Sequence, residues 1–433
     1  MTSRERVARA LDHREPDRVP LDLGGTVVSG MHVSSVYRLR QALGVDPPGT
    51  PVKVIEPYQM LGEIGIDLMD RLGADVVSLA SRDTLFGFPN EGWKPWRLFD
   101  GTPVLVPGGF NTTPEKNGDI LMYPEGDRSV RPSGRMPKGG YYFDTIVRQG
   151  PLREEDLDPA DNSEEFQPMG PENIGSLASE GERLRRETDR AVLANFGGVG
   201  FGDIALVPAP WLKDPRGIRD VEEWYISTVS RKDYVRRVFE NQCEIGLANL
   251  QKLAEALTAC VDILFVSGTD FGMQTGPFIS PDAYRELYKP FHRRINDWVH
   301  ENTPWKTFMH SCGSVVDLLP DIIDAGFDIL NPVQCSAAGM EPERLKKEFG
   351  DRIVFWGGGS DTQHTLPFGD PEDVRREARE RIRSFGPAGG YVFAAIHNIQ
   401  AKIPEHNLLA LFDAHGEASG YPLGRSGRRR GAR

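Results

Sequence analysis

Residues 306–333, with the sequence KTFMHSCGSVVDLLPDIIDAGFDILNPV, decide the fold class. The runs at 306–310 and 328–333 are short and apolar, whereas residues 315–325 between them have a helical pattern. Two strands joined through one helix normally lie parallel in a single sheet, with a right-handed crossover. The stretch therefore predicts one repeat of an alternating β/α fold.

The same alternation continues on both sides of this stretch. Ser280-Pro281 and Asp370-Pro371 each place a capping side chain before a proline, which is a signal for the start of a helix. We expect strands at 19–23, 74–80, 191–196, 261–267, 353–356 and 391–395, and helices at 33–44, 59–72, 281–301, 341–349 and 371–385. This number of units predicts a single (β/α)8 barrel, with a doubly wound sheet as the rival fold.

Residues 82–150 interrupt the alternation with a stretch rich in glycine, proline and aromatic residues. Turn residues bracket short alternating runs there, so we interpret it as a β-hairpin insertion in a rim loop. Its aromatic residues either cap a bound molecule or form a small core of their own, and we favour the second: Phe86, Phe88, Trp93 and Trp96. The barrel is expected to span residues 1–423, followed by a basic, disordered tail at 424–433.

Composition narrows the class of protein. The chain has 433 residues, a net charge of −12 and 39% hydrophobic residues, which suits a globular protein and not a nucleic-acid binder or a ligand of anionic membranes. No apolar run is long enough for a membrane span, and the charged N-terminus lacks the apolar core of a signal peptide. With only four cysteines, which do not suggest a disulfide framework, we expect a cytoplasmic protein.

His310 and Cys312 form the most informative local pattern. They lie two residues apart at the end of a predicted strand, so both side chains leave the strand on the same face. In an α/β barrel this end of the strands carries the catalytic groups. Imidazole and thiolate are both zinc ligands, and a catalytic zinc needs three protein ligands and one open position.

A third ligand would come from the end of another strand. Cys335, Asp270 and His397 all occupy such positions. We favour His397, because a neutral imidazole completes the set without further negative charge, and we expect Asp270 to act beside His310 as a catalytic group. Whether Cys335 or Asp270 is a fourth ligand stays open.

Other polar or flexible residues follow the neighbouring strands and are expected to line the same cavity and bind a cofactor. They are Asn331, Gln334, Gly358, Asp361 and Gln363. Glycines such as Gly358 at a strand end let the backbone approach a ligand closely, although they also relieve crowding at the rim. Asp22, followed by Gly24 and Gly25, stands at the end of the first predicted strand in the same way.

Several segments together resemble the uroporphyrinogen decarboxylase superfamily of (β/α)8 barrels. They are RVARALDHREPDRVPLDLGG (6–25), PYQMLGEIGIDLMDRLGADVV (57–77), GTDFGMQTGPFISPDAYRELYKPFHRRIND (268–297), FMHSCGSVVDLLPDIIDAGFDILNPVQ (308–334), FWGGGSDTQ (355–363) and GGYVFAAIHNIQAKIPEHNLLAL (389–411). The resemblance implies the barrel fold over nearly the whole chain, outside the insertion and the tail.

This superfamily contains two chemistries. One branch is the metal-free tetrapyrrole decarboxylases, which carry an N-terminal Arg-Gln-Ala-Gly-Arg segment; here DLGGTVVSGMHV stands near that position, and the rim segments are poor in arginine. The other branch is the zinc methyltransferases that work with a corrinoid protein. They resemble this chain in a His-x-Cys on a strand, matched by His310 and Cys312, and in a third ligand before a Pro-x-Glu-Asn segment. His397 lies ten residues before Asn407 of IPEHN, where that branch has cysteine.

The resemblance therefore implies a zinc-dependent methyltransferase that moves a methyl group between a small O- or N-methylated donor and a corrinoid protein partner. A zinc with one thiolate keeps a positive charge, which favours activation of an oxygen or nitrogen leaving group. The alternatives are a metal-free decarboxylase of a carboxylated tetrapyrrole or smaller acid, and a catalytically idle barrel that binds a tetrapyrrole or a protein. Members of the superfamily are often dimers, so a homodimer is one option by analogy, and the oligomeric state is left open. The identity of the donor, and whether the insertion caps it or binds the corrinoid partner, are left open.

Overall fold

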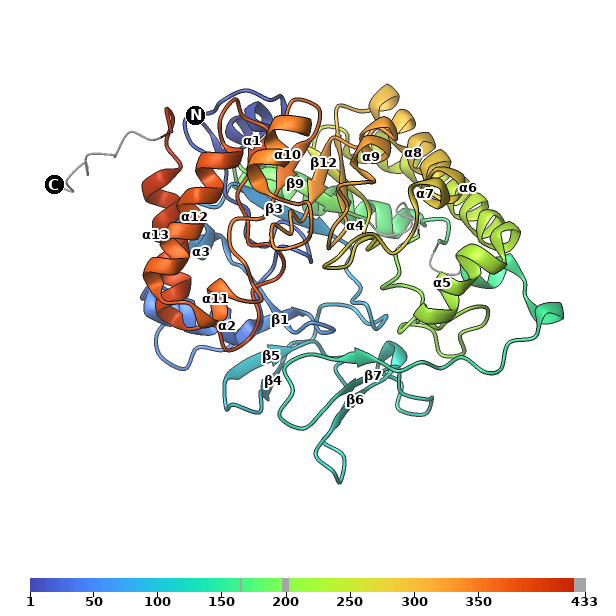
Figure 1. Cartoon of the computed structure of the whole chain (residues 1–433). Coiled ribbons are helices and arrows are strands. Elements are labelled where there is room, and N and C mark those ends of the chain that lie inside the picture. The colour runs from blue at the N-terminus through green and yellow to red at the C-terminus, as the bar shows by residue number, and fades with distance from the viewer. Residues whose placement is uncertain (164–165, 197–201, 424–433) are drawn as a thin grey trace.

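The computed structural model describes residues 1–163, 166–196 and 202–423. Its central sheet has seven parallel strands in the order β14-β13-β12-β11-β10-β9-β3 (Figure 1). Their bounds are β3 Val76–Ala80, β9 Ala191–Asn195, β10 Ile263–Ser267, β11 Lys306–His310, β12 Ile329–Asn331, β13 Val354–Trp356 and β14 Tyr391–Val392. Strands that follow one another along the chain are neighbours in the sheet, which is the order of a barrel and not of a doubly wound sheet.

The chain around Leu21 closes the barrel between its two edge strands. Leu21 forms a parallel bridge with Phe393, just after β14, and its carbonyl accepts a 2.7 Å hydrogen bond from the backbone N–H of Asp75, just before β3. The expected strand at 19–23 is thus reduced to a single bridge. Its ladder is interrupted because the Asp75 carboxylate, instead of a backbone carbonyl, accepts the Leu21 N–H at 2.8 Å. The predicted (β/α)8 barrel is confirmed.

Helices surround this sheet (Figure 1). They are α1 Ser3–Leu11, α2 Val33–Ala42, α3 Ile66–Leu72, α4 Pro171–Glu187, α5 Val221–Ser230, α6 Lys232–Leu257, α7 Pro281–Leu287, α8 Lys289–Asn302, α9 Leu319–Asp324, α10 Pro342–Phe349, α11 Thr365–Phe368, α12 Pro371–Phe385 and α13 Glu405–Ala418. None of the helices in the described residues combines the length and apolar character that crossing a membrane requires.

Three helix predictions need correction. The helix expected at 315–325 begins only at Leu319, as α9. The expected helix at 281–301 is divided at Tyr288 into α7 and α8, because Pro290 lies in the first turn of α8 and cannot continue an earlier helix. The expected helix at 59–72 is wrong in its first half. Residues Leu61–Gly62 form the short strand β2, and the helix begins only after Gly65.

The insertion is β-rich, as expected, and lies below the barrel in Figure 1. One sheet has the order β2-β1-β5-β4, with β1 Val52–Glu56, β4 Lys94–Arg97 and β5 Pro103–Val106; a second contains β6 Ile120–Met122, β7 Gly134–Met136 and β8 Asp144–Thr145. The first sheet therefore recruits chain from before residue 82. Short 3-10 turns lie at Pro124–Gly126, Glu154–Asp156 and Pro159–Ser163.

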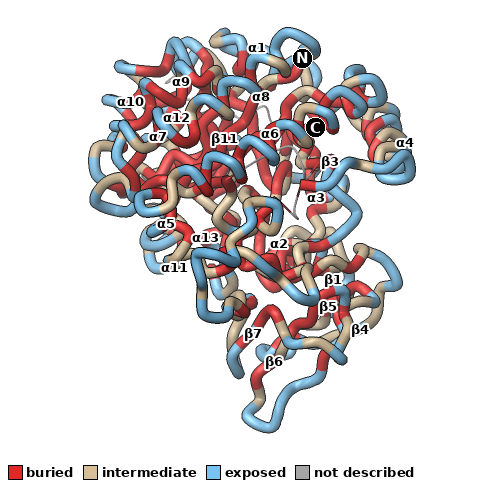
Figure 2. Tube along the Cα trace, turned by 90° about the vertical axis from the view of Figure 1, so that its right-hand side faces the viewer, coloured by how far each residue is buried: buried red, intermediate tan, exposed pale blue. Residues whose placement is uncertain are grey.

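Aromatic residues of the insertion pack against one another and extend the core of the barrel. Phe86 and Phe88 are 0% and 2% exposed, and Phe86 packs against Phe143, which in turn packs against Phe110. Trp96 packs on Phe110 with ring centroids 5.3 Å apart. Figure 2 shows buried chain inside the insertion as well as inside the barrel. Phe86, Phe88 and Trp96 are therefore packing residues, although their core is continuous with that of the barrel.

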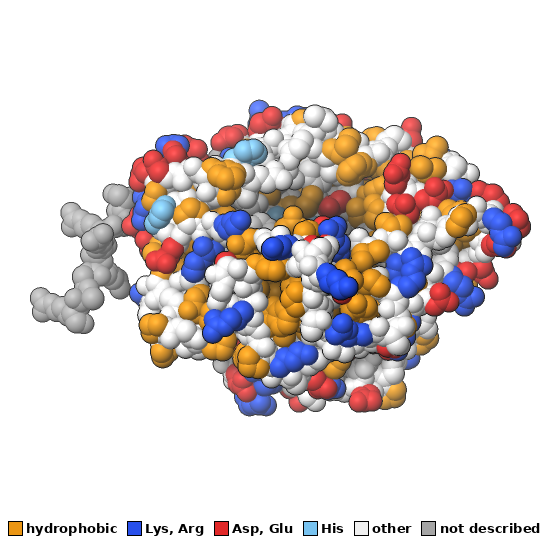
Figure 3. Space-filling view, turned by 90° about the horizontal axis from the view of Figure 1, so that it is seen from below, with side chains coloured by type: hydrophobic (Ala, Val, Ile, Leu, Met, Phe, Trp, Pro, Cys, Tyr) orange, Lys and Arg blue, Asp and Glu red, His pale blue; other side chains and the backbone are white. Residues whose placement is uncertain are grey.

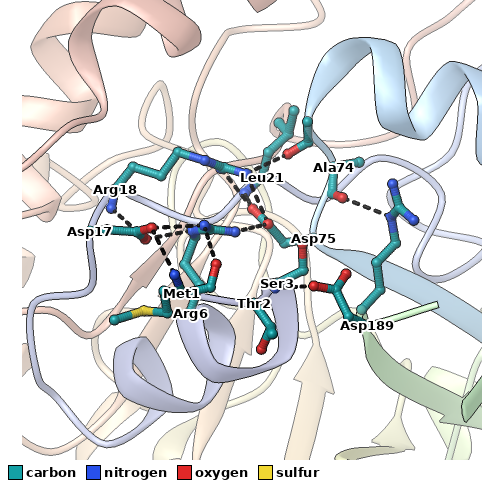
Figure 4. A network of polar contacts seen from close by, with 12 residues as sticks. Met1, Thr2, Ser3, Arg6, Asp17, Arg18, Leu21, Ala74, Asp75 and Asp189 are labelled. Carbon is teal, nitrogen blue, oxygen red and sulfur yellow. Dashed lines mark hydrogen bonds and ion pairs between the residues drawn. The ribbon is translucent and has the colours of Figure 1, made fainter.

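An ion-pair network fixes the N-terminal helix at the opposite end of the barrel from His310 (Figure 4). Asp75, which is fully buried, pairs with Arg6 at 2.6 Å and with Arg18 at 2.8 Å, and Arg6 also pairs with Asp17. Asp75 directly precedes β3, whereas His310 ends β11. The network therefore stabilises the amino-terminal face and leaves the carboxyl-terminal face for the site.

Candidate metal centre

Three side chains converge at the carboxyl ends of the barrel strands. His310 is the last residue of β11, Cys312 follows it by two residues, and His397 lies in the loop after β14. The Cys312 Sγ is 3.5 Å from His310 Nε2, and the rings of His310 and His397 meet edge to face with centroids 5.3 Å apart. One ligand atom from each of the three lies within 4.8 Å of the others. Cys312 and His397 are only partly buried, so this group faces an opening.

The orientation of the His310 ring is set by its neighbours. Its Nδ1 is 2.7 Å from the Asn331 Oδ1, while the Asn331 Nδ2 donates to the Trp356 carbonyl at 3.0 Å. Because the amide nitrogen is used in this way, its oxygen accepts a proton from Nδ1. The Nε2 lone pair of His310 then points toward Cys312. A metal-binding histidine is commonly held by such a hydrogen bond from its other nitrogen.

The turn that carries Cys312 is also held by side chains from neighbouring strands. The Asp270 Oδ1 accepts the Cys312 N–H at 2.7 Å and lies 3.9 Å from His310 Nε2, and Gln334 accepts the Gly313 N–H at 2.8 Å. Gly313 has φ +82°, and a Cβ there would lie 2.4 Å from the Gly272 carbonyl oxygen, so only glycine fits this close approach. Asp270 therefore lies beside the converging atoms without being one of them.

Burial keeps both imidazoles neutral. It lowers the pKa of His310, and burial together with the neighbouring His310 lowers the pKa of His397 to about 4. Burial, and then the charge of Asp270, raise the pKa of the Cys312 thiol well above its usual range. Two neutral nitrogens and one sulfur that loses its proton only to a cation form a suitable donor set for zinc with one open position.

Cys335, the other candidate thiol, points elsewhere. Its Sγ lies 3.4 Å from the Val333 carbonyl and 4.0 Å from that of Gly358, and burial raises its pKa to about 12. It does not join the group of converging atoms. Of the three alternatives for the third ligand, His397 joins the pair in the converging group, while the Asp270 carboxylate lies beside it, 3.9 Å from His310 Nε2.

The remaining predicted residues divide into two groups. Asn331 and Gln334 hold the His310–Gly313 segment, as described above. Asp361 instead accepts the N–H of Gln363 at 2.7 Å and thereby shapes its own loop, and Gln363 accepts a 3.2 Å bond from Gln274. A Cβ on Gly358, which has φ +74°, would lie 2.9 Å from the Val333 carbonyl, so packing alone explains this glycine. A cofactor-binding role for these residues stays a prediction.

Trp356 is the site residue that sequence reasoning missed. Its indole N–H donates to Asp22 at 2.8 Å, and its carbonyl orients Asn331. Burial raises the pKa of Asp22 to about 6. The strand prediction at 353–356 contained Trp356, but a backbone carbonyl has no sequence signal. Asp22 had a predicted position at a strand end but no role.

Comparison with known proteins identifies relatives of this domain. Residues 216–418 match the family model described as Uroporphyrinogen decarboxylase (URO-D). A uroporphyrinogen decarboxylase from Pelodictyon phaeoclathratiforme is 26% identical over 199 residues, covering 43% of this chain and 53% of that protein. One from Gloeobacter violaceus is 23% identical over 285 residues, covering 63% of this chain and 74% of the relative. The chain spans about half the length of the first of these curated relatives.

A solved structure extends the likeness to the whole fold. A methyltransferase from Methanosarcina mazei superposes with a TM-score of 0.53 at 16% identity, over 96% of this chain and 99% of that protein. At this identity the likeness concerns the fold. The segment that matches the Uroporphyrinogen decarboxylase (URO-D) family model, residues 216–418, contains His310, Cys312 and His397.

Proposed function

We propose that this chain is a zinc-dependent methyltransferase that moves a methyl group between a small O- or N-methylated donor and a corrinoid protein. The observation that carries the proposal is the convergence of His310, Cys312 and His397 within 4.8 Å at the catalytic end of the barrel. The whole-chain similarity in fold to a methyltransferase supports it. The fold alone does not assign a reaction, because one fold hosts many functions.

The three ligands would hold the zinc through one thiolate and two neutral imidazoles. Bound there, the metal would keep a net positive charge and act as a Lewis acid toward the oxygen or nitrogen that loses the methyl group. Asn331 keeps the proton of His310 on Nδ1, which leaves Nε2 free to bind. Asp270 lies 3.9 Å from that Nε2. Its carboxylate would supply or accept the proton that the oxygen or nitrogen exchanges when it loses the methyl group.

The corrinoid partner would reach the site from the side of the insertion. Figure 3 views the molecule from below, and on this face Lys and Arg side chains lie among apolar side chains on one side of a hollow, whereas Asp and Glu side chains lie on its other side. The chain as a whole carries a net charge of −12, so the positive charge of this region contrasts with the negative charge of the whole protein. Such a region favours an acidic partner by electrostatic steering.

Zinc content tests the proposal. We expect one zinc per chain in protein purified without added metal, measured by mass spectrometry of the element, and loss of that zinc in Cys312→Ser and His397→Ala. Cys335→Ser is the matched control, since its Sγ is buried against carbonyls outside the ligand set. Methyl transfer to a cobalt(I) corrinoid should be lost with the zinc. Full zinc occupancy in Cys312→Ser would contradict the proposed centre.

A metal-free decarboxylase is the second candidate, because the curated relatives carry that name. It predicts release of carbon dioxide from a porphyrinogen by protein treated with a chelator. The two functions are thus separated by one preparation: zinc removal abolishes the first activity and leaves the second.

A further inference from the structure

A cavity of about 480 Å³ opens at the seam between the insertion and the loop that follows His397. Three segments far apart in the sequence meet there, and none of their residues belongs to the candidate metal centre. The lining consists of Tyr58, Gln59, Tyr141, Tyr142, Phe143, Asp144, Gln400, Ala401 and Lys402.

Buried polar side chains form hydrogen bonds to the residues that line this cavity. Glu56 accepts the backbone N–H of Tyr58 at 2.9 Å and of Gln59 at 2.8 Å. Asn398, which is fully buried, donates to the Gln59 side chain at 2.8 Å. These contacts join the segment after β1 to the loop after β14.

The insertion wall is fixed in the same way. His32 is 1% exposed and donates from Nε2 to the Tyr141 carbonyl at 2.8 Å, and its ring meets the Tyr141 ring edge to face at 5.6 Å. Phe143 donates its backbone N–H to the Tyr58 carbonyl at 2.8 Å. The cavity is therefore pre-formed, which is the condition for binding a small ligand without a large ordering cost.

The rim of the cavity carries one charge of each sign. The Lys402 ammonium lies 4.7 Å from the centroid of the Tyr141 ring, and its backbone adopts φ +64°, which is uncommon for a side-chain-bearing residue. Asp144 is exposed on the opposite segment. Within the described residues, neither Lys402 nor Asp144 forms an ion pair with the other or with any other residue. A ligand with both charges would complement both residues.

Aromatic rings decide which kind of cation fits. Three tyrosines and a single carboxylate line the cavity. A tyrosine ring attracts a cation but does not accept strong hydrogen bonds. An ammonium with N–H groups would therefore lose its hydrogen bonds to water there, whereas a quaternary ammonium has none to lose. We propose that this cavity binds a small zwitterion of the betaine class, with its quaternary ammonium among the tyrosines near Asp144 and its carboxylate at Lys402. Gln59 and Gln400 supply amide groups for the carboxylate or for bridging water.

This site goes beyond the proposed function and does not depend on it. The lining of the cavity contains none of His310, Cys312 and His397, so the ligand does not need the metal centre to bind. Binding should therefore be the same in the wild type and in Cys312→Ser. Failure of the zinc proposal leaves this inference standing, and the reverse also holds.

Isothermal titration calorimetry with three matched probes tests the ligand class. Glycine betaine carries both charges, 3,3-dimethylbutyrate replaces its nitrogen with carbon, and choline replaces its carboxylate with a hydroxymethyl group. We expect glycine betaine to bind about tenfold more tightly than either analogue, since each lacks one charge contact worth about 1.4 kcal/mol. Equal binding of 3,3-dimethylbutyrate, or no heat from glycine betaine at millimolar concentration, would overturn the proposal.

Variants locate the binding. Lys402→Met should weaken glycine betaine about tenfold and leave choline unchanged, whereas Asp144→Asn should weaken both. Lys116→Met, an exposed lysine of the insertion that does not line the cavity, is the control and should bind like the wild type. Circular dichroism checks that each variant is folded. Equal affinities of Lys402→Met and Lys116→Met for glycine betaine would place the ligand elsewhere and refute the assignment.

Discussion

Among single residues, Asn331 orients His310 of the His310–Cys312 pair for metal binding. It fixes the proton of His310 through a 2.7 Å hydrogen bond and is itself fixed by the Trp356 carbonyl. We expect Asn331→Ala to lower zinc affinity about 10- to 100-fold, measured by competition with a coloured chelator. Gln363→Ala, whose side chain contacts only the neighbouring Gln274 among the bonds described, should keep the wild-type affinity. Equal affinities for both variants would show that His310 does not depend on this contact.

The pH dependence of zinc binding follows from the shifted pKa values of the same residues. The thiol of Cys312 has a raised pKa, so zinc must displace its proton throughout the neutral range. The pKa values of both imidazoles are lowered, to about 4 for His397, so the histidines contribute less to the proton release at neutral pH than the thiol does. We expect affinity to fall about tenfold for each unit of pH decrease between 8 and 6, because one proton is exchanged. A slope of two or three protons would mean that the histidines also titrate.

The sequence predicted the His310–Cys312 pair for a reason that needs no tertiary information. Residues two apart on a strand share a face, so their convergence is local. The third ligand is different. Closure of the barrel brings His397 to the pair, and from the sequence alone Cys335, Asp270 and His397 all stood at suitable strand ends. Asn331 was predicted at the rim from its type and position, but its role of orienting His310 was not. The part of Trp356 is played by a backbone carbonyl, which leaves no trace in residue type or spacing.

At the scale of elements, the link between α1 and β3 depends on one carboxylate. Asp75 is fully buried, pairs with Arg6 and Arg18, and accepts the Leu21 N–H that closes the barrel. We expect Asp75→Ala to lower the free energy of unfolding by about 3–5 kcal/mol, because it removes the buried carboxylate that pairs with Arg18 and is one of the two that pair with Arg6. Asp17→Ala is the control. Its side chain is 44% exposed, so loss of its Arg6 pair should cost below about 1 kcal/mol. Urea unfolding measures the free energy of unfolding of both variants. Equal decreases in this free energy would contradict the central role of Asp75 in the network.

Element boundaries show where local patterns stop being sufficient. The helix at 371–385 was predicted at its observed bounds because Asp370 and Pro371 mark its start with capping chemistry. The strand expected at 19–23 failed because a distant carboxylate replaced a backbone partner. Residues Leu61–Gly62 became a strand because β1, an element that apolar alternation did not reveal, lies beside them in the sheet.

At the scale of the whole molecule, the insertion is expected to unfold together with the barrel. Val52 and Lys53 of β1 pair with Val104 and Leu105 of β5, so a sheet of the insertion contains a strand from the chain before it. His32, at the start of α2, also bonds to Tyr141. We expect contacts of this kind to couple the two regions into one cooperative unit, as a single domain over residues 1–423 would require.

Calorimetry tests this coupling. We expect one thermal transition for the intact chain, with the same midpoint by far-ultraviolet circular dichroism and by tryptophan fluorescence, to which Trp93 and Trp96 of the insertion contribute. Tyr141→Gly removes the ring contact with His32 and should lower that one midpoint by a few degrees for all probes. If the insertion instead melted first, the tryptophan signal would move alone while the barrel retained its zinc. That result would make the insertion a separate domain, and the apparent cavity at its seam would then open before the metal centre is lost.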